Sequence, residues 1–188
     1  EQQPSPRFPL ILNTGRIRDQ WHTMTRTGKA ARLMAHSPEP YVDINTGDAA
    51  ALGLAPASIA EIESESGRVL TRVIVSQQQP AGSVFVPMHW TGMLASRARV
   101  GSVTGAATDP ISGQPELKHT AVAIRPLAVR WHGFAVAVAK PPLEIAAYTA
   151  IARVASGFRI ELAGTDEPTS WDDAVRALLG LPQTGAET

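Results

Sequence analysis

Residues 13–28, NTGRIRDQWHTMTRTG, concentrate side chains that can bind phosphates and flat rings. The segment holds three arginines and four threonines around a single acid, Asp19. A guanidinium donates paired hydrogen bonds to a phosphate, threonine hydroxyls add single donors, and Trp21 and His22 offer ring faces and ring N–H groups. The Thr-Gly pair near its start follows an apolar run, so backbone N–H groups there can face a ligand that comes close. The segment predicts a site for a phosphate-bearing, ring-containing ligand; burial of Trp21 as a core anchor is the alternative.

Two acid-poor basic segments stand out in a chain whose net charge is zero. Residues 14–32 carry five cations against one acid, and residues 66–108 contain four arginines and no Asp or Glu. The balanced total leaves no global field that would steer the molecule to nucleic acid or to a membrane. The distribution therefore indicates a local anion-binding face, with two solvated basic loops as the alternative. The arginines of the second segment are Arg68, Arg72, Arg97 and Arg99.

The sequence lacks the motifs of several catalytic sites. It has no G-x-S-x-G, no G-x-x-x-x-G-K-[ST] and no G-x-G-x-x-G, and Asp172-Asp173 is better explained as the start of a helix than as a catalytic pair. With no cysteine and five scattered histidines, neither a thiolate nor a metal site is expected, and cytoplasmic residence fits. We predict binding rather than bond breaking by the chain's own side chains, with no catalytic residue and no metal ligand.

No apolar run is long enough for a transmembrane helix, and no signal-peptide pattern opens the chain. The polar, proline-containing residues 1–9 are interpreted as the linker end of a fragment cut from a larger protein.

Short strands joined by long loops are predicted, which is typical of a β-barrel that carries a site on its loops. Residues 16–40 show no clean period and are expected to form an ordered loop with one helical turn around 29–34. Asn45 or Thr46 is expected to cap a short helix that ends at Gly53. Apolar runs and alternation predict strands at 8–12, 41–44, 58–64, 68–76, 83–88 and 119–124.

The pattern changes after Pro126. Residues 129–139 alternate, with Phe134, Val136 and Val138 on one face. Residues 152–164 predict a hairpin that turns at Ser156-Gly157, with Phe158, Ile160 and Leu162 inward, and residues 169–180 predict a helix capped by Ser170. We expect a domain over 1–127 and an extension over 128–188 that packs on it without chemistry of its own.

Four blocks of the sequence resemble the C-terminal domain of molybdopterin oxidoreductases, most closely that of assimilatory nitrate reductase. They occur in the same order and spacing, over about 115 residues. The stretch GQPELKHTAV, and the tail from residue 130 to residue 164, are similar to the nitrate reductase branch. The blocks are residues 12–28, 43–67, 83–90 and 109–124.

The resemblance implies a mainly β fold with short helices: a double-psi β-barrel with a C-terminal β-hairpin and helix extension. It implies binding of bis-molybdopterin guanine dinucleotide, with the iron–sulfur cluster and the molybdenum-ligating Cys lying upstream of this chain. The parent reaction would be reduction of nitrate to nitrite, and this fragment alone would not be catalytic. Its partners would be the upstream catalytic domains and the cofactor, with no nucleic acid and no membrane.

By motif match, the resemblance also implies the cofactor contacts. The first block supplies Thr14, Gly15, Arg16, Gln20, Trp21, His22 and Thr23, and later blocks supply His89, Trp90 and Lys118. One position departs from the pattern, because relatives commonly carry Asn where this chain has Gly101, followed by Ser102. The contact there is expected from the backbone of Gly101 or the hydroxyl of Ser102, or it is missing.

Two alternatives stay open. A formate dehydrogenase or a periplasmic-type nitrate reductase would carry a similar domain, although the tail after Pro126 counts against both. A non-catalytic double-psi barrel could instead serve as an interaction module, with the basic face binding a partner protein or nucleic acid. A guanine nucleotide bound at residues 14–25 and 101–118 would favour the enzyme.

Overall fold

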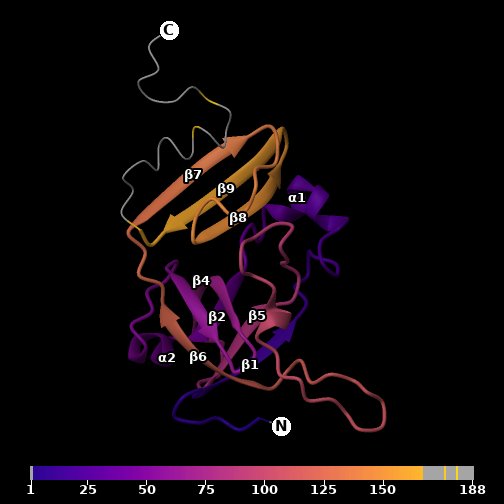
Figure 1. Cartoon of the computed structure of the whole chain (residues 1–188), viewed down its shortest axis with the longest axis vertical. Coiled ribbons are helices and arrows are strands. Elements are labelled where there is room, and N and C mark those ends of the chain that lie inside the picture. Colours follow the sequence, from indigo (N-terminus) through magenta and orange to yellow (C-terminus); the bar gives the residue numbers. More distant parts are fainter. Residues whose placement is uncertain (1, 167–175, 177–180, 182–188) are drawn as a thin grey trace.

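Nine strands form a closed barrel and a separate sheet in the computed structural model, which describes residues 2–166, 176 and 181 (Figure 1). The barrel strands are β1 (Leu10–Gly15), β2 (Tyr41–Asn45), β3 (Ile59–Glu63), β4 (Arg68–Ser76), β5 (Ser83–Pro87) and β6 (Thr120–Pro126). They close in the order β1-β5-β2-β4-β3-β6. The sheet has the order β7-β9-β8 and consists of β7 (Trp131–Ala137), β8 (Tyr148–Val154) and β9 (Gly157–Gly164).

The strand pairing of the barrel is symmetric between its two halves. β1 pairs in parallel with β5, and β2 pairs in parallel with β4, whereas the remaining neighbours are antiparallel. If β1, β2 and β3 are exchanged with β4, β5 and β6, respectively, each pair of neighbouring strands is replaced by a pair that also exists in the barrel and has the same direction. The fold is a double-psi β-barrel, and the predicted fold class is confirmed.

Alternate side chains of the barrel strands fill its interior, as the period of two requires. Leu12, Ile44, Val73 and Val84 are among these buried residues, and they belong to one hydrophobic cluster. Strand β4 also carries apolar side chains on its outer face. Leu70, which belongs to a second cluster outside the barrel, is fully buried, whereas Ile74 further along is 43% exposed.

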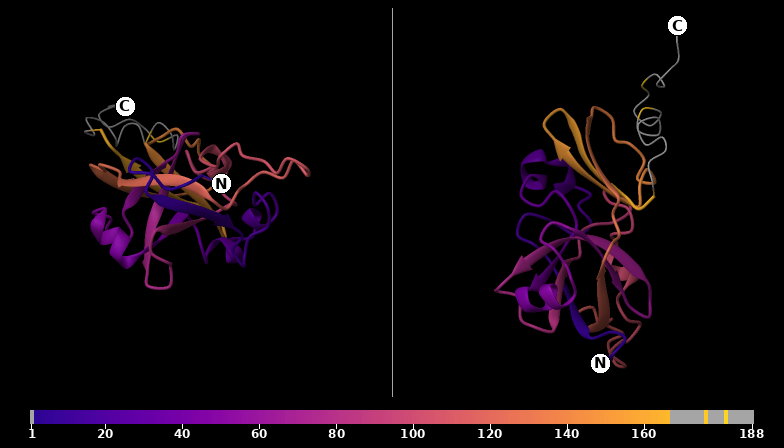
Figure 2. Two further views of the ribbon diagram at one scale, coloured as in Figure 1. Left: turned by 90° about the horizontal axis from the view of Figure 1, so that it is seen from below. Right: turned by 90° about the vertical axis from the view of Figure 1, so that its left-hand side faces the viewer.

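This second cluster joins the barrel to the three-stranded sheet. Ile59 and Leu70 come from the barrel, Tyr148 comes from β8, and all three are buried. Met34 ends a short helix, α1 (Ala31–Met34), that packs against β8. The sheet therefore lies stacked on the barrel, with α1 beside β8 (Figures 1 and 2).

One short helix, α2, occurs where capping residues predict it. Asn45 accepts a 2.8 Å hydrogen bond from the Gly47 N–H at the start of α2 (Thr46–Ala51), and Gly53 adopts φ +66° after its end. The loop over 16–40 contains η1 (Thr27–Lys29) and α1, as expected. A further turn, η2 (Val100–Ser102), lies in the loop before β6.

The extension forms the predicted hairpin, β8–β9, with Ile160 and Leu162 buried. The larger side chains of β7 lie on its outer face, since Phe134 is 64% exposed and Val136 is 63% exposed. The helix predicted over 169–180 lies outside the described residues, except for Arg176. Within the described part of the chain, no helix is long and apolar enough to cross a membrane.

Replacement of Met34 by alanine is expected to lower the free energy of unfolding by about 2–5 kcal/mol, because the lost side chain leaves a cavity between α1 and the sheet. Met93 is 45% exposed and provides the control, with an expected loss within about 0.5 kcal/mol. Urea unfolding followed by circular dichroism measures both variants. Equal losses would show that the second cluster does not stabilise the fold.

Candidate functional site

A cavity of about 200 Å³ lies where the end of β1 meets the loops that follow β5 and precede β6. Four of the predicted site residues line it: Thr14, Thr23, Trp90 and Gly101. Its remaining lining residues are Met88, Thr91, Arg99, Val100, Thr104 and Leu117. Pockets that enclose a whole organic ligand measure about 300–1,000 Å³, so this cavity has room for only part of such a ligand.

The end of β1 is tied to the loop that precedes β6. The Thr14 hydroxyl donates to the Leu117 carbonyl at 2.6 Å, and the Lys118 ammonium donates to the Thr14 carbonyl at 2.7 Å. A methyl group on Gly15 would come within 2.9 Å of the Phe85 ring, so the backbone approaches its neighbour closely there. Residues more than one hundred positions apart are thereby brought together at the end of one strand.

His89 binds the backbone of the loop that follows β1 at two points. Its Nε2 accepts a 3.0 Å hydrogen bond from the Ile17 N–H, so the proton is on Nδ1, which donates to the His22 carbonyl at 2.6 Å. Burial lowers the pKa of this imidazole below its ordinary value of 6.5. The hydrogen bond to the His22 carbonyl raises the pKa, and nearby positive charge from Arg16 and His22 lowers it further. The ring is therefore neutral. Since both nitrogens are used by the backbone, His89 positions the loop, whereas the resemblance implied a direct contact.

Three residues of this loop form an exposed cluster. The Trp21 side chain is 53% exposed, so the alternative of a core anchor is wrong. Its ring lies edge-on to His22 at 4.7 Å, and the Arg16 guanidinium lies 5.7 Å from the ring centre. His22 adopts φ +44°, a left-handed conformation that is uncommon for a residue other than glycine. The cluster presents a cation, an indole and an imidazole to the outside.

Among the described residues, five buried side-chain polar atoms have no hydrogen-bond partner, and two of them belong to predicted site residues. These two are Nε1 of Trp90, which is fully buried, and Oε1 of Gln20, which is 4% exposed. The Gln20 amide nitrogen lies 3.5 Å from the Met34 sulfur. An unsatisfied buried polar group costs about 1–3 kcal/mol, and such groups often mark where a ligand completes the structure.

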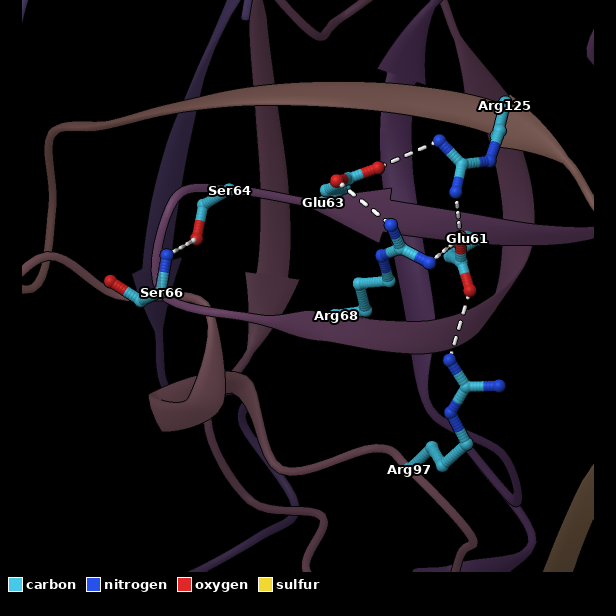
Figure 3. A network of polar contacts seen from close by, with 7 residues as sticks. All are labelled: Glu61, Glu63, Ser64, Ser66, Arg68, Arg97 and Arg125. Carbon is cyan, nitrogen blue, oxygen red and sulfur yellow. Dashed lines mark hydrogen bonds and ion pairs between the residues drawn. The ribbon is translucent and has the colours of Figure 1, made fainter.

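The arginines of the second basic segment are largely used in internal ion pairs (Figure 3). Glu61 and Glu63 of β3 bind Arg68, Arg97 and Arg125. The Glu61–Arg97 distance is 2.9 Å, Glu63–Arg68 is 3.1 Å and Glu63–Arg125 is 2.7 Å. Glu61 is buried within β3, and this network supplies the partners that its carboxylate needs there.

Arg72 is also neutralised, since its Nε donates to Glu39 at 3.0 Å. The predicted anion-binding face is therefore wrong for Arg68, Arg72 and Arg97. Arg99 differs, because it is exposed, lines the cavity and has no carboxylate partner in the described part of the chain. One signal for Arg99 was visible in the sequence: it lies in an acid-free segment, two residues before Gly101.

Arg97 fixes the loop that carries Arg99 and Gly101. It adopts φ +50°, its carbonyl accepts from the Leu70 N–H at 2.9 Å, and its guanidinium is held by Glu61. Beyond it, the Gly101 carbonyl accepts a 3.1 Å hydrogen bond from Thr104. A methyl group on Gly101 would meet only the Arg99 side chain, at 3.8 Å, so there is room at this position for the asparagine of relatives.

The family described as "Molydopterin dinucleotide binding domain" matches residues 10–121. The chain belongs to this family. It is 43% identical over 165 residues to a nitrate reductase of Klebsiella oxytoca, covering 87% of this chain and 19% of that protein. It is 30% identical over 125 residues to formate dehydrogenase H of Escherichia coli, covering 64% of this chain and 16% of that protein. This molybdopterin dinucleotide-binding domain thus spans less than a fifth of these relatives.

The solved acetylene hydratase of Pelobacter acetylenicus contains a similar fold. The TM-score is 0.55 at 20% sequence identity, over 64% of this chain and 18% of that one, which supports the fold alone.

The residues at the cavity fit a phosphorylated, ring-bearing cofactor. Arg99 lines the cavity with a charge that no carboxylate neutralises within the described residues, Thr14 and Thr23 supply hydroxyls, and Nε1 of Trp90 is a further donor. Arg16, also without a carboxylate partner in that part of the chain, and Gln20, with its unsatisfied acceptor, lie outside the lining of this cavity, in the loop that follows β1. No group of three acidic or histidine side chains that could hold a metal ion occurs in the described part of this molybdopterin dinucleotide-binding domain.

Acid is expected to destabilise the domain partly through His89. Because the folded-state pKa lies below the unfolded value, the unfolded chain binds the proton more readily, and stability falls as the pH drops below about 6.5. His89→Gln should flatten this dependence between about pH 7 and pH 5, whereas His132→Gln, at an exposed position, should not. Urea unfolding across that range measures the slopes, and equal slopes for both variants would contradict the assignment.

Loss of the Arg97 side chain is expected to loosen the loop over 98–103. In Arg97→Met, amide exchange of Ser102 and Val103 should become about three to ten times faster, because one charged hydrogen bond no longer holds the loop. Arg68→Met is the matched control, since it removes an arginine of the same network and leaves the Arg97–Glu61 pair in place. Hydrogen exchange followed by NMR measures both. Similar acceleration in the two variants would argue against a specific role of Arg97.

Proposed function

We propose that this chain is the cofactor-binding domain of a molybdenum-dependent nitrate reductase, in which it holds bis-molybdopterin guanine dinucleotide. The observation that carries the proposal is the convergence of Thr14, Thr23, Trp90 and Arg99 on one cavity in a domain of this family. The parent enzyme would reduce nitrate to nitrite, and this domain would not catalyse the reaction alone.

The predicted contacts then divide into three kinds. Arg16, Arg99 and Lys118 would bind phosphate oxygens, since a buried charged hydrogen bond is among the stronger polar contacts. Trp21 and His22 would lie against a ring, and Gly15 would let the ligand approach the backbone. When bound, the cofactor supplies two-electron chemistry at molybdenum.

The buried atoms of Trp90 and Gln20 would complete their hydrogen bonds on the cofactor. His89 would keep the loop of residues 16–23 in shape without touching the ligand. Gly101 would contribute its backbone, or Ser102 its hydroxyl. The chain's part in catalysis would be to bind, to neutralise phosphate charge and to exclude water.

Nitrate is preferred to formate because the match to the Klebsiella oxytoca nitrate reductase covers 87% of the chain and so includes part of the extension, whereas the formate dehydrogenase match covers 64%. Within this proposal, residues 1–127 form the binding domain and 128–188 its extension. The proposal also includes a role in nitrate assimilation, cytoplasmic residence rather than that of a periplasmic-type enzyme, and an iron–sulfur cluster in upstream domains of the same polypeptide.

GDP is expected to bind this chain at millimolar concentration, because it carries the guanosine and pyrophosphate half of the dinucleotide. Selective NMR shifts should appear at Thr14–Thr23, Arg99, Gly101 and Lys118 with GDP, and not with AMP. Arg99→Met should weaken GDP binding about tenfold, since it removes a charged hydrogen bond.

Arg32→Met gives the matched control, because Arg32 is exposed and does not line the cavity. Shifts at the same residues with an acidic peptide or an oligonucleotide, steeply weakened by salt, would instead favour the interaction module. GDP binding that is unaffected by Arg99→Met would remove Arg99 from the site.

A further inference from the structure

A second cavity, of about 390 Å³, lies between the loops of the barrel and the three-stranded sheet. Its volume falls within the range of pockets for small organic molecules. None of its lining residues is a predicted cofactor contact. They are Met24, Thr25, Gly28, Lys29, Met93, Leu94, Lys140, Arg153 and Phe158.

One part of this cavity is apolar and firmly packed. Met24 and Leu94 are 1% and 7% exposed, and both belong to the cluster that joins barrel and sheet. A methyl group on Gly28 would lie 3.1 Å from each of these side chains, so glycine leaves room that any other residue would fill. Phe158 adds an aromatic ring from β9. These surfaces suit the apolar body of a ligand.

The polar part of the cavity is cationic. Lys29, Lys140 and Arg153 line it, no lining residue is acidic, and none of the three has a carboxylate partner among the residues that the structure describes. Lys140 donates to the Met93 carbonyl, and the Arg153 guanidinium lies 4.8 Å from the centre of the Phe158 ring. Two of the cations are thus held in place by neutral groups, so their charge remains available to an anion.

The backbone of the cavity wall is strained at one point. Met24 is buried and adopts φ +61°, which costs a residue other than glycine about 1 kcal/mol or more and persists where the surroundings enforce it. The same two loops line both cavities: Thr23 and Trp90 face the first, and Met24 and Leu94 the second. Arg153 and Phe158 come from the extension, for which the sequence suggested packing alone.

We propose that the second cavity binds a small organic anion with a flat apolar body, of the class of aryl phosphates and aryl carboxylates. The ring lies against Met24, Leu94 and Phe158, and the anionic group is bound by Arg153 and Lys140. Both the barrel loops and the extension are needed to form the site. This inference does not depend on the identity of the cofactor in the first cavity.

Phenyl phosphate is the probe, because it combines the ring with the anion. An NMR titration of the 188-residue chain should show saturable shifts at Gly28, Leu94, Arg153 and Phe158, with little change at Gly101 and Lys118. Inorganic phosphate, which lacks the ring, and benzyl alcohol, which lacks the charge, should each bind at least about tenfold more weakly. Equal binding of either control, or shifts confined to the first cavity, would overturn the proposal.

Variants separate this site from general surface charge. Arg153→Met should weaken phenyl phosphate about tenfold and leave the GDP shifts of the first cavity unchanged. Arg7→Met is the matched control, since Arg7 lies 4.8 Å from the ring centre of Phe8 and does not line the cavity. If urea unfolding shows that Arg153→Met is destabilised, Lys140→Met serves as the second variant. If either variant is folded and binds phenyl phosphate with wild-type affinity, the proposal is wrong.

Discussion

The parallel pairing of β1 with β5 is the constraint on which the candidate site depends. Parallel neighbours end at the same edge of a sheet, and here Gly15 pairs with Pro87, the last residues of the two strands. The loops that leave both strands therefore start side by side. His89, two residues past β5, can reach across and bind the backbone of the loop that follows β1 at two points.

Both neutral and charged contacts hold the loops of the site in place. His89 acts through hydrogen bonds of an uncharged ring, which suits its full burial, whereas Arg97 is held at a half-exposed ion pair. The paired glutamates of β3 use three arginines that would otherwise spread positive charge over the barrel wall. Arg99 at the first cavity, and Lys29, Lys140 and Arg153 at the second, are among the cations that have no carboxylate partner in the described residues.

Local patterns in the sequence predicted most of the fold, because strand alternation, helix capping and turns depend on residues that are close together in the sequence. Alternation located the strands, Asn45 and Gly53 bounded α2, and the Ser156-Gly157 hairpin formed as expected. The burial of Glu61 was not predicted, because the arginines that bind it come from another strand and a loop far away in the sequence. Likewise, Arg68 is neutralised by a carboxylate and Arg99 is not, because the two arginines have different neighbours in the folded chain. A local sequence pattern does not contain this information. The outward face of β7 was missed for the same reason, since alternation gives two faces without saying which one is buried.

The symmetry of the strand pairing is what two tandem copies of one three-stranded unit would produce. The edge at Gly15 and Pro87 has a counterpart where β2 and β4 end, at Asn45 paired with Ser76. After Gly15 the chain runs through residues 16–40 before the next strand, whereas after Ser76 only residues 77–82 intervene. Divergence of a duplicated ancestor would thus have left one end with long insertions suited to ligand capture and the other with a short turn and a capped helix. In that history the barrel is the inherited part, and the insertions at a single end are the acquired one.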